Sequence, residues 1–379
     1  MRLKNLMAYL FLGTIAISCI KDEAPNSEAD IETCTLQGDV LNRDAIIEND
    51  KVTLIVKKGT DVTALAPQFT LTPGATITPA SGSTLNFTIP QTYIVTSEDG
   101  KWKKTYQIEV NASGLTTSRY GFENVRFDSN GKYQIFYETD QQGKEVMTWA
   151  SGNPGFALTG VKGDYTVYPT YQSANGRNSG NCLGLTTRIT GSLGNLMNMP
   201  LASGNLFIGT FDVLNALTNA LTSTQFGAQF EYIPTYLRGY YKYKAGETFY
   251  VVDKTRPDKL RPVPGEKDIF DIYAVFYEST EDLPLLDGTN VLDETTETVL
   301  AVARINNAKE TNEWTEFELP FVFRDGKTVD PVKLAAGKYN LSIVFASSIR
   351  GNYFEGAPGS TLYIDDVVLE YEDMKPEEE

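Results

Sequence analysis

The sequence contains no histidine. This excludes Ser-His-Asp and Cys-His catalysis, and it removes the commonest ligand of transition metals. There are three cysteines, and the sequence has neither the Gly-rich loop that cradles phosphate nor the spacing of a zinc site. Any enzymatic chemistry would therefore rest on carboxylate, lysine, tyrosine or hydroxyl groups.

Positive charge is also scarce. The chain carries 33 Lys and Arg against 49 Asp and Glu, which gives a formal net charge of −16. An acidic surface repels phosphate backbones, so nucleic acid is a poor partner. Aromatic residues are plentiful, with 21 Tyr and 19 Phe. Because such rings pack well on a pleated surface, the composition favours strands over helices.

Residues 1–18 have the pattern of a secretory signal. Arg2 and Lys4 precede an apolar run from Leu6 to Ile17 that is too short to span a bilayer comfortably. The run ends in Ala16-Ile17-Ser18-Cys19, which resembles the lipobox of bacterial lipoproteins, although Ala stands where that motif usually has Leu. The resemblance implies that Cys19 is lipidated. The alternative is a buried Cys in a transmembrane anchor.

Residues 19–30 are polar, as expected of a tether. Their start, Ile20-Lys21-Asp22-Glu23, resembles the surface-export signal of Bacteroidetes lipoproteins. This implies an outer-membrane protein that faces the cell exterior. A charged, solvated tether without export information is the alternative.

Two further cysteines, Cys34 and Cys182, lie in different predicted domains. The compartment permits a disulfide, but the separation favours two unpaired, buried thiols.

Residues 31–112 predict a small all-β domain. Short alternating runs recur with turn signals between them, and Glu98-Asp99-Gly100 joins two of them as a hairpin. Thr60–Pro67, together with Pro73-Gly74-Ala75 and Pro79, resembles the immunoglobulin-like modules at the front of many Bacteroidetes surface lipoproteins. The resemblance implies a β-sandwich that acts as a spacer. The strands expected here are 52–56, 69–72, 75–78, 93–96 and 104–110.

Residues 119–373 predict one larger jelly-roll β-sandwich, because strand patterns dominate and amphipathic helices are almost lacking. Residues 212–222 fit either one short helix or a loop. Residues 374–379 form an acidic tail. The expected strands are 120–128, 206–211, 240–243, 270–276, 298–303, 314–319, 339–345 and 360–371.

Three stretches of this larger region, 148–156, 237–246 and 347–367, resemble the putative carbohydrate metabolism domain of Bacteroidetes lipoproteins. The resemblance covers roughly residues 119–371. Final strands of the Leu362-Tyr-Ile-Asp-Asp366 kind also occur in jelly-roll carbohydrate-binding modules. The resemblance implies a fold and a carbohydrate ligand, and no established activity.

Sugar binding needs flat apolar faces for the rings and polar groups for the hydroxyls. Trp149 precedes a loop-like run that includes Asn153, a setting that suits a stacking platform. Tyr241 and Tyr243 share one face of a strand. We expect these four residues to contact ligand; packing of the rings in the core is the alternative.

Arg350, Asn352, Tyr353 and Glu355 lie in a Gly-rich loop before the final strand, where a rigid sandwich often carries its binding residues. A turn with a locally satisfied Arg is the alternative. The resemblance to jelly-roll modules also implies a structural calcium held by Asp365, with Glu123 as a partner, because calcium takes oxygen ligands. Acids capping an edge strand are the alternative. We expect no other cofactor.

Three hypotheses for function follow. The leading one is a surface lipoprotein that binds glycans without catalysis, beside neighbouring glycan-uptake proteins. The second is a glycoside hydrolase that uses paired carboxylates, although no local motif singles out two of the 49 acids. The third is a structural or adhesive surface protein.

Overall fold

The computed structural model describes residues 25–38, 40–41, 44–47, 49–57, 60–112, 114–115, 117–140 and 142–372. The predicted signal segment, Cys19 and the tail from 374 to 379 lie outside the described residues, as does the start of the tether. The chain forms two compact units, the first within residues 25–110 and the second built mainly from residues 111–372. Within the described residues no helix is long and apolar enough to cross a membrane.

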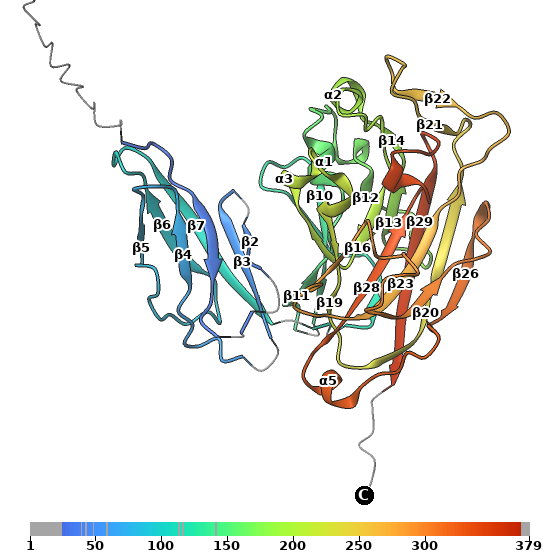
Figure 1. Cartoon of the computed structure of the whole chain (residues 1–379). Coiled ribbons are helices and arrows are strands. Elements are labelled where there is room, and N and C mark those ends of the chain that lie inside the picture. The colour runs from blue at the N-terminus through green and yellow to red at the C-terminus, as the bar shows by residue number, and fades with distance from the viewer. Residues whose placement is uncertain are drawn as a thin grey trace, which may run out of the picture. The chain divides into compact units, whose positions relative to one another are not determined.

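The first unit is a β-sandwich of two sheets (Figure 1). The rings of Phe69 and Tyr93, one from each sheet, have centroids 5.0 Å apart and help to close the sandwich. The alternating pattern correctly predicts a small all-β sandwich, and the immunoglobulin-like type is what the family resemblance implies. The small sheet pairs β1 (Ile31–Thr35) with β4 (Gln68–Leu71). The larger sheet has the order β2 (Ile46–Ile47), β3 (Lys51–Val56), β7 (Lys103–Ala112), β6 (Gln91–Thr96) and β5 (Thr76–Thr78).

The second unit is a sandwich of two larger sheets. Sheet one has the order β12 (Thr170–Ser173), β13 (Cys182–Thr186), β29 (Thr361–Glu372), β20 (Ile233–Lys244) and β26 (Thr311–Pro320), and β8 (Arg119–Tyr120) also pairs with β29. Sheet two has the order β16 (Asn205–Phe207), β28 (Tyr339–Ala346), β23 (Asp271–Glu278), β25 (Val299–Arg304) and β27 (Val322–Phe323), and β19 (Ala228–Gln229) also pairs with β28.

Eight of these strands follow one another along the chain as β13, β16, β20, β23, β25, β26, β28 and β29. In sheet one, β13, β29, β20 and β26 are neighbours in that order, and they are the first, eighth, third and sixth of the eight strands. In sheet two, β16, β28, β23 and β25 are neighbours, and they are the second, seventh, fourth and fifth. This interleaving is the order of a jelly roll, so the predicted fold is confirmed.

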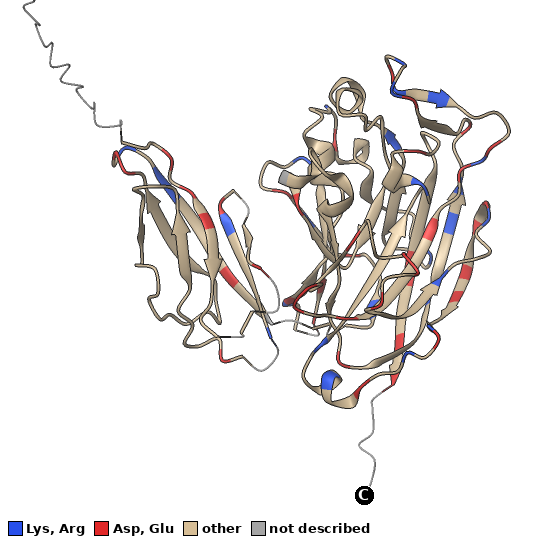
Figure 2. Cartoon of the chain, in the orientation of Figure 1, with Lys and Arg blue, Asp and Glu red and all other residues tan. Residues whose placement is uncertain are grey.

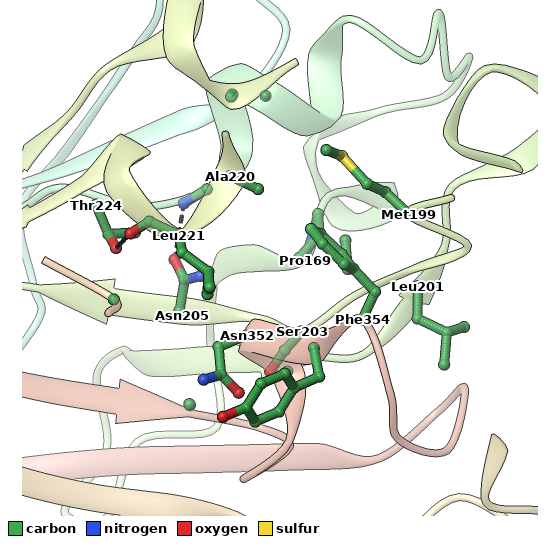
Figure 3. Close-up of a pocket in the computed structure, with 18 of the residues that line it drawn as sticks. Pro169, Met199, Leu201, Ser203, Asn205, Ala220, Leu221, Thr224, Asn352 and Phe354 are labelled. Carbon is green, nitrogen blue, oxygen red and sulfur yellow. Dashed lines mark hydrogen bonds between the residues drawn. The ribbon is translucent and has the colours of Figure 1, made fainter. Parts of the chain in front are cut away.

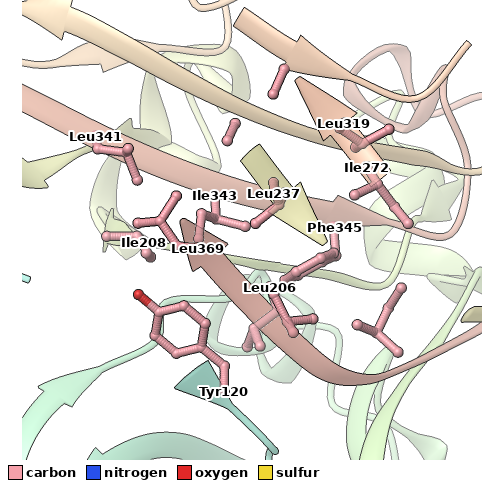
Figure 4. Close-up of a cluster of buried hydrophobic side chains, with 14 of the residues drawn as sticks. Tyr120, Leu206, Ile208, Leu237, Ile272, Leu319, Leu341, Ile343, Phe345 and Leu369 are labelled. Carbon is pink, nitrogen blue, oxygen red and sulfur yellow. The ribbon is translucent and has the colours of Figure 1, made fainter. Parts of the chain in front are cut away.

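The core lies between the two sheets. Leu237 and Leu369 of sheet one meet Ile272, Ile343 and Phe345 of sheet two in one buried cluster (Figure 4). β20 alternates between buried and half-buried residues, because one of its faces is open to solvent. β23 and β28 are buried along almost their whole length, because short elements also cover the outer face of sheet two.

The remaining short elements lie in the connections between these strands. They are β9 (Val125–Phe127), β10 (Gln134–Thr139), β11 (Glu145–Thr148), α1 (Asn153–Ala157), η1 (Tyr165–Val167), β14 (Arg188–Ile189), α2 (Gly191–Leu196), β15 (Leu201–Ala202), β17 (Gly209–Phe211), α3 (Val213–Ala216), α4 (Ala220–Ser223), β18 (Thr224–Phe226), β21 (Tyr250–Val252), β22 (Leu260–Pro262), β24 (Leu286–Asp287), α5 (Pro331–Ala335) and η2 (Gly351–Tyr353). Among them, α1, α2, β15, β17, α3, α4, β18 and η2 contribute residues to the candidate site.

Three local predictions differ from the structure. The strand expected over 206–211 is split into β16 and β17, which belong to different sheets. The strand expected over 120–128 is split into β8 and β9, because Phe122 between them has a left-handed backbone with φ 56°. Residues 212–222 form two short helices, α3 and α4, rather than one, because Asn219 leaves the helical conformation with φ −146°. Cys34 and Cys182 are free and buried, as expected.

Candidate functional site

A pocket of about 500 Å³ lies on the outer face of sheet two. Its floor is formed by side chains of the central strands, among them Phe207, Tyr273 and Val344. Residues of α1, α2, α3, α4 and η2 stand around this floor. The volume falls in the range of pockets that hold small ligands, so the jelly roll supplies a rigid base and its loops supply the walls.

One wall is the segment from α2 to β15. Leu193, Met197 and Met199 turn apolar side chains toward the pocket. The hydroxyl of Thr190 donates a 2.5 Å hydrogen bond to the carbonyl oxygen of Met199 and so closes this loop. Gly194 is buried inside it, close to both residues. None of the residues of α2 is charged, and the helix is tan throughout in Figure 2.

The opposite wall comes from α3 and α4. In the view of Figure 3, Leu221 and Asn205 are drawn together on one side, with Asn352 below them, and Met199 and Phe354 lie on the other side. Leu217, Ala220 and Thr224 extend the wall that carries Leu221.

The third wall is the loop that contains η2. Asn352 and Tyr353 are exposed there, and 60% of the Tyr353 surface is open to solvent. Arg350 does not line the pocket. Its guanidinium pairs with Glu355 and, at 3.2 Å, with Glu266. These ion pairs hold the ends of the loop in place, while Asn352 and Tyr353 between them stay accessible to solvent.

A buried polar network anchors the same loop from below. One carboxylate oxygen of Asp268, Oδ2, accepts hydrogen bonds from the hydroxyls of Ser348 at 2.6 Å and Ser360 at 2.7 Å. It also accepts the backbone N–H of Ala357 at 2.7 Å. Burial raises the pKa of Asp268, and these donors oppose the shift. The network fixes both ends of the segment that presents Asn352 and Tyr353.

The rim of the pocket is unusually apolar for a surface. Large apolar side chains that are exposed usually occur singly, whereas a cluster indicates a binding surface. Five such side chains line this one pocket, each 37–60% exposed, namely Leu158, Leu193, Leu217, Ile349 and Tyr353.

Two carboxylates line the pocket among the described residues, Asp271 and Asp293. Asp271 is buried, and Arg304 donates to both of its oxygens, at 3.1 and 2.7 Å. Burial raises the pKa of Asp271, and Arg304 opposes the shift. Asp293 is exposed, and the backbone N–H and hydroxyl of Thr295 lower its pKa by donating to Oδ1. Each carboxylate thus has a partner within the protein.

Residues 121–370 match the family model described as "Putative carbohydrate metabolism domain". The chain belongs to this family. Residues 32–110 match a second model, described as "SGBP, N-terminal", where SGBP denotes a surface glycan-binding protein. The two matches together span both units of the chain.

Two solved structures from this comparison share about half of their residues with the chain. A Bacteroides thetaiotaomicron protein described as a putative glycoside hydrolase is 52% identical, with a TM-score of 0.84, and the match covers 93% of this chain and all of that one. A Bacteroides vulgatus protein with the same description is 48% identical, with a TM-score of 0.62, over 69% of this chain and 99% of that one. No curated protein matches.

Within this family fold, the structure overturns the predicted aromatic platform. Trp149 is 3% exposed and packs against Tyr120 and Phe345. Its indole Nε1–H donates a 2.9 Å hydrogen bond to Glu138. Tyr241 and Tyr243 are each 2% exposed. The expectation that these rings stack on a sugar is wrong, because the inner faces of both sheets seal them in the core.

The remaining predicted ligand contacts divide between structural and accessible residues. The Asn153 side chain is fully buried and bonds both the carbonyl oxygen and the N–H of Thr170, so its predicted contact with ligand is also wrong. Arg350 and Glu355 brace the η2 loop, which is the locally satisfied turn given as the alternative. Tyr353 lines the pocket.

The predicted calcium ligands have other partners. One carboxylate oxygen of Asp365 accepts the backbone N–H of Arg177 at 2.7 Å. Glu123 accepts the backbone N–H and the side-chain amide of Asn181. Among the described residues no group of three or more Cys, Asp or Glu could hold a metal ion. The two acids anchor the loop from 174 to 181, because its backbone N–H groups need acceptors.

Sequence reasoning missed most of the residues that form the pocket. Leu193, Met197, Met199 and Phe354 lie in Gly- and Asn-rich loops, where no period assigns an apolar side chain to a face. The available signal was the apolar content of those loops, because large apolar residues in an otherwise polar loop need either a core or a ligand.

Proposed function

We propose that this chain is a non-catalytic glycan-binding protein, and that the pocket on sheet two holds part of an oligosaccharide. The observation that carries the proposal is the accessible rim, where Tyr353 offers a ring to a pyranose face beside the free amide of Asn352. Membership of a carbohydrate metabolism family and the match of the first unit to surface glycan-binding proteins support it.

We place the protein on the outer membrane, facing outward and lipidated at Cys19. The sequence patterns at residues 1–23 support this placement, as does the class of protein that the first unit matches. The first unit would then act as a spacer, and captured glycan would pass to neighbouring uptake proteins. Growth of cells with labelled palmitate tests the anchor: label in the wild type and its loss in Cys19→Ser are expected, and an unlabelled wild type would contradict the anchor.

Hydrolysis is the second candidate, because both solved relatives are described as putative glycoside hydrolases and two carboxylates line the pocket. Hydrolysis needs one carboxyl to give a proton and another to act as base or nucleophile. The ion pair of Asp271 with Arg304 and the hydrogen bonds of Asp293 disfavour both roles. Release of reducing ends that is lost in Asp293→Asn would favour hydrolysis over simple binding.

A glycan array followed by calorimetry tests the proposal. We expect the purified chain to bind at least one neutral oligosaccharide, and Tyr353→Ala to weaken that binding about tenfold or more. Phe127→Ala is the matched control, because Phe127 is a 50% exposed aromatic residue of the same unit that does not line the pocket. Equal weakening by both variants, or no binding to any glycan of the array, would refute the proposal.

A further inference from the structure

The polar side chains of the pocket are mostly engaged within the protein. The hydroxyls of Thr159, Thr190 and Thr224 donate to backbone carbonyl oxygens of Phe156, Met199 and Leu221. Those of Ser203 and Ser348 belong to the network around Asp268. A hydroxyl group that already donates its proton within the protein can still accept a hydrogen bond from a ligand, but it cannot donate one. The walls are therefore more apolar in effect than their composition suggests.

Two carboxamides are the exception. Asn205 accepts the N–H of Gly152 at 2.7 Å through Oδ1, so its other terminal atom is the Nδ2 donor. Within the described residues that Nδ2 group has no acceptor, and the exposed Asn352 side chain bonds no protein group. Figure 3 draws both amides, with Asn352 below Asn205. The pocket thus presents N–H donors against apolar walls.

The charge of the pocket narrows the ligand further. No Lys or Arg is among the described residues that line it, whereas Asp271 and Asp293 are. A uronate or sulfated sugar would find no cation among these lining residues and would meet the exposed carboxylate of Asp293, whereas the charge of Asp271 is balanced by Arg304. The lining of the pocket therefore disfavours an anionic ligand.

An unsubstituted sugar ring fits these walls poorly. Each hydroxyl that loses water without gaining a partner costs about 1–3 kcal/mol. Acetylation replaces a hydroxyl hydrogen by an acetyl group, or the hydroxyl by an acetamido group, and the methyl group that it adds favours burial against apolar walls by about 0.8 kcal/mol. Acetylation also adds a carbonyl oxygen, and a carbonyl oxygen is the acceptor that Asn205 and Asn352 lack.

From these contacts we infer that the pocket recognises an acetylated neutral glycan, with an acetyl carbonyl bound by Asn205 or Asn352 and its methyl group against Leu193, Met199 or Leu221. The inference rests on the proposed function and specifies the substrate class of the same site. The inference concerns recognition of the acetyl group and does not specify the sugar that carries it.

Matched neutral ligands test it by calorimetry on the whole chain. One pair is the β-1,4-linked tetramer of N-acetylglucosamine and that of glucose, which differ in the acetamido group. The other is acetylated xylo-oligosaccharide before and after removal of its acetyl groups by alkali. We expect the acetylated member of at least one pair to bind about tenfold or more tightly.

Two variants locate the preference in this pocket. Asn352→Leu removes an amide at nearly constant size, and Leu193→Ser removes an apolar rim contact. Both should lower the ratio of acetylated to unacetylated affinity, while Val332→Ser should not. Val332 is a 76% exposed side chain of α5, which lies at the other end of the unit from α2 (Figure 1).

The outcomes separate the two proposals. Equal affinity within both pairs overturns the acetyl assignment and leaves glycan binding intact. If the chain binds an unacetylated ligand on the array but none of the four probes, the acetyl assignment is likewise overturned and glycan binding is left intact. A chain that binds neither the probes nor anything on the array overturns both. A preference that survives Asn205→Leu as well as Asn352→Leu and Leu193→Ser overturns the assignment to this pocket.

Discussion

The indole Nε1–H of Trp149 donates a 2.9 Å hydrogen bond to the Glu138 carboxylate inside the core of the second unit. Burial raises the pKa of Glu138 to about 7, although this bond opposes the shift. A carboxyl group is thus held in the core as a partner for an indole, and its protonation couples the core to pH.

Glu138→Gln should remove one pH dependence of stability. The pKa of a Glu in the unfolded chain is about 4.3, whereas burial raises the pKa of Glu138 to about 7 in the folded chain. Between these values the folded state holds more protons, so its stability falls as the pH rises from about 4 to 7 and is level on either side. The free energy of unfolding of wild type minus variant should drop by roughly 3 kcal/mol between pH 4 and pH 8. If the difference in unfolding free energy between wild type and Glu138→Gln does not change with pH, Glu138 does not titrate as described.

Trp149→Phe should destabilise the protein without weakening glycan binding by the folded fraction. The variant leaves the buried Glu138 carboxyl without its donor, which costs about 1–3 kcal/mol. Denaturant unfolding measures this loss, and calorimetry below the new melting temperature measures affinity. If Trp149→Phe loses affinity for glycan while its stability is unchanged, Trp149 contacts the sugar, and our interpretation of it as a core residue is wrong.

The ion pair of Asp271 and Arg304 should show strong coupling in a double-mutant cycle. Arg304→Gln leaves the buried carboxylate of Asp271 unpaired, and we expect a loss of about 3 kcal/mol in unfolding free energy. Adding Asp271→Asn removes that charge, so the double variant should recover much of the stability. If the losses from the two substitutions simply add, the pair does not stabilise the pocket floor as described.

Gly194→Ala should deform one wall of the pocket. A methyl group at Gly194 would collide with the Thr190 side chain and lie 2.6 Å from the carbonyl oxygen of Met199, two groups that the wall keeps together. We expect glycan affinity to fall about tenfold or more. Ser192→Ala, at an exposed position of the same helix, should leave affinity unchanged. Wild-type affinity in Gly194→Ala would show that this wall does not touch the ligand.

The strands were predictable because their pattern is local. β20 alternates along its length, and that alternation correctly assigned Tyr241 and Tyr243 to one face of the sheet. It could not tell which face is covered. Burial of these rings depends on contacts with Phe270, a residue from another part of the chain. Trp149 is likewise sealed by Phe345, almost two hundred positions away.

The pocket was harder to predict, because its walls are loops held by long-range bonds. The prediction that the loop of Tyr353 reaches the surface beside the final strand follows from its glycines and polar residues. That Arg350 and Glu355 pair with each other, leaving Asn352 and Tyr353 to line the pocket, depends on side-chain geometry. The wall from α2 has no counterpart in any sequence pattern.

A crystal structure of the chain with the tightest-binding glycan tests the central claim most directly. We predict sugar density in the pocket on sheet two, with a hydrogen bond from the Asn205 or Asn352 amide and the Tyr353 ring against the ligand. Density confined to the solvent face of sheet one, or to the first unit, would contradict the account.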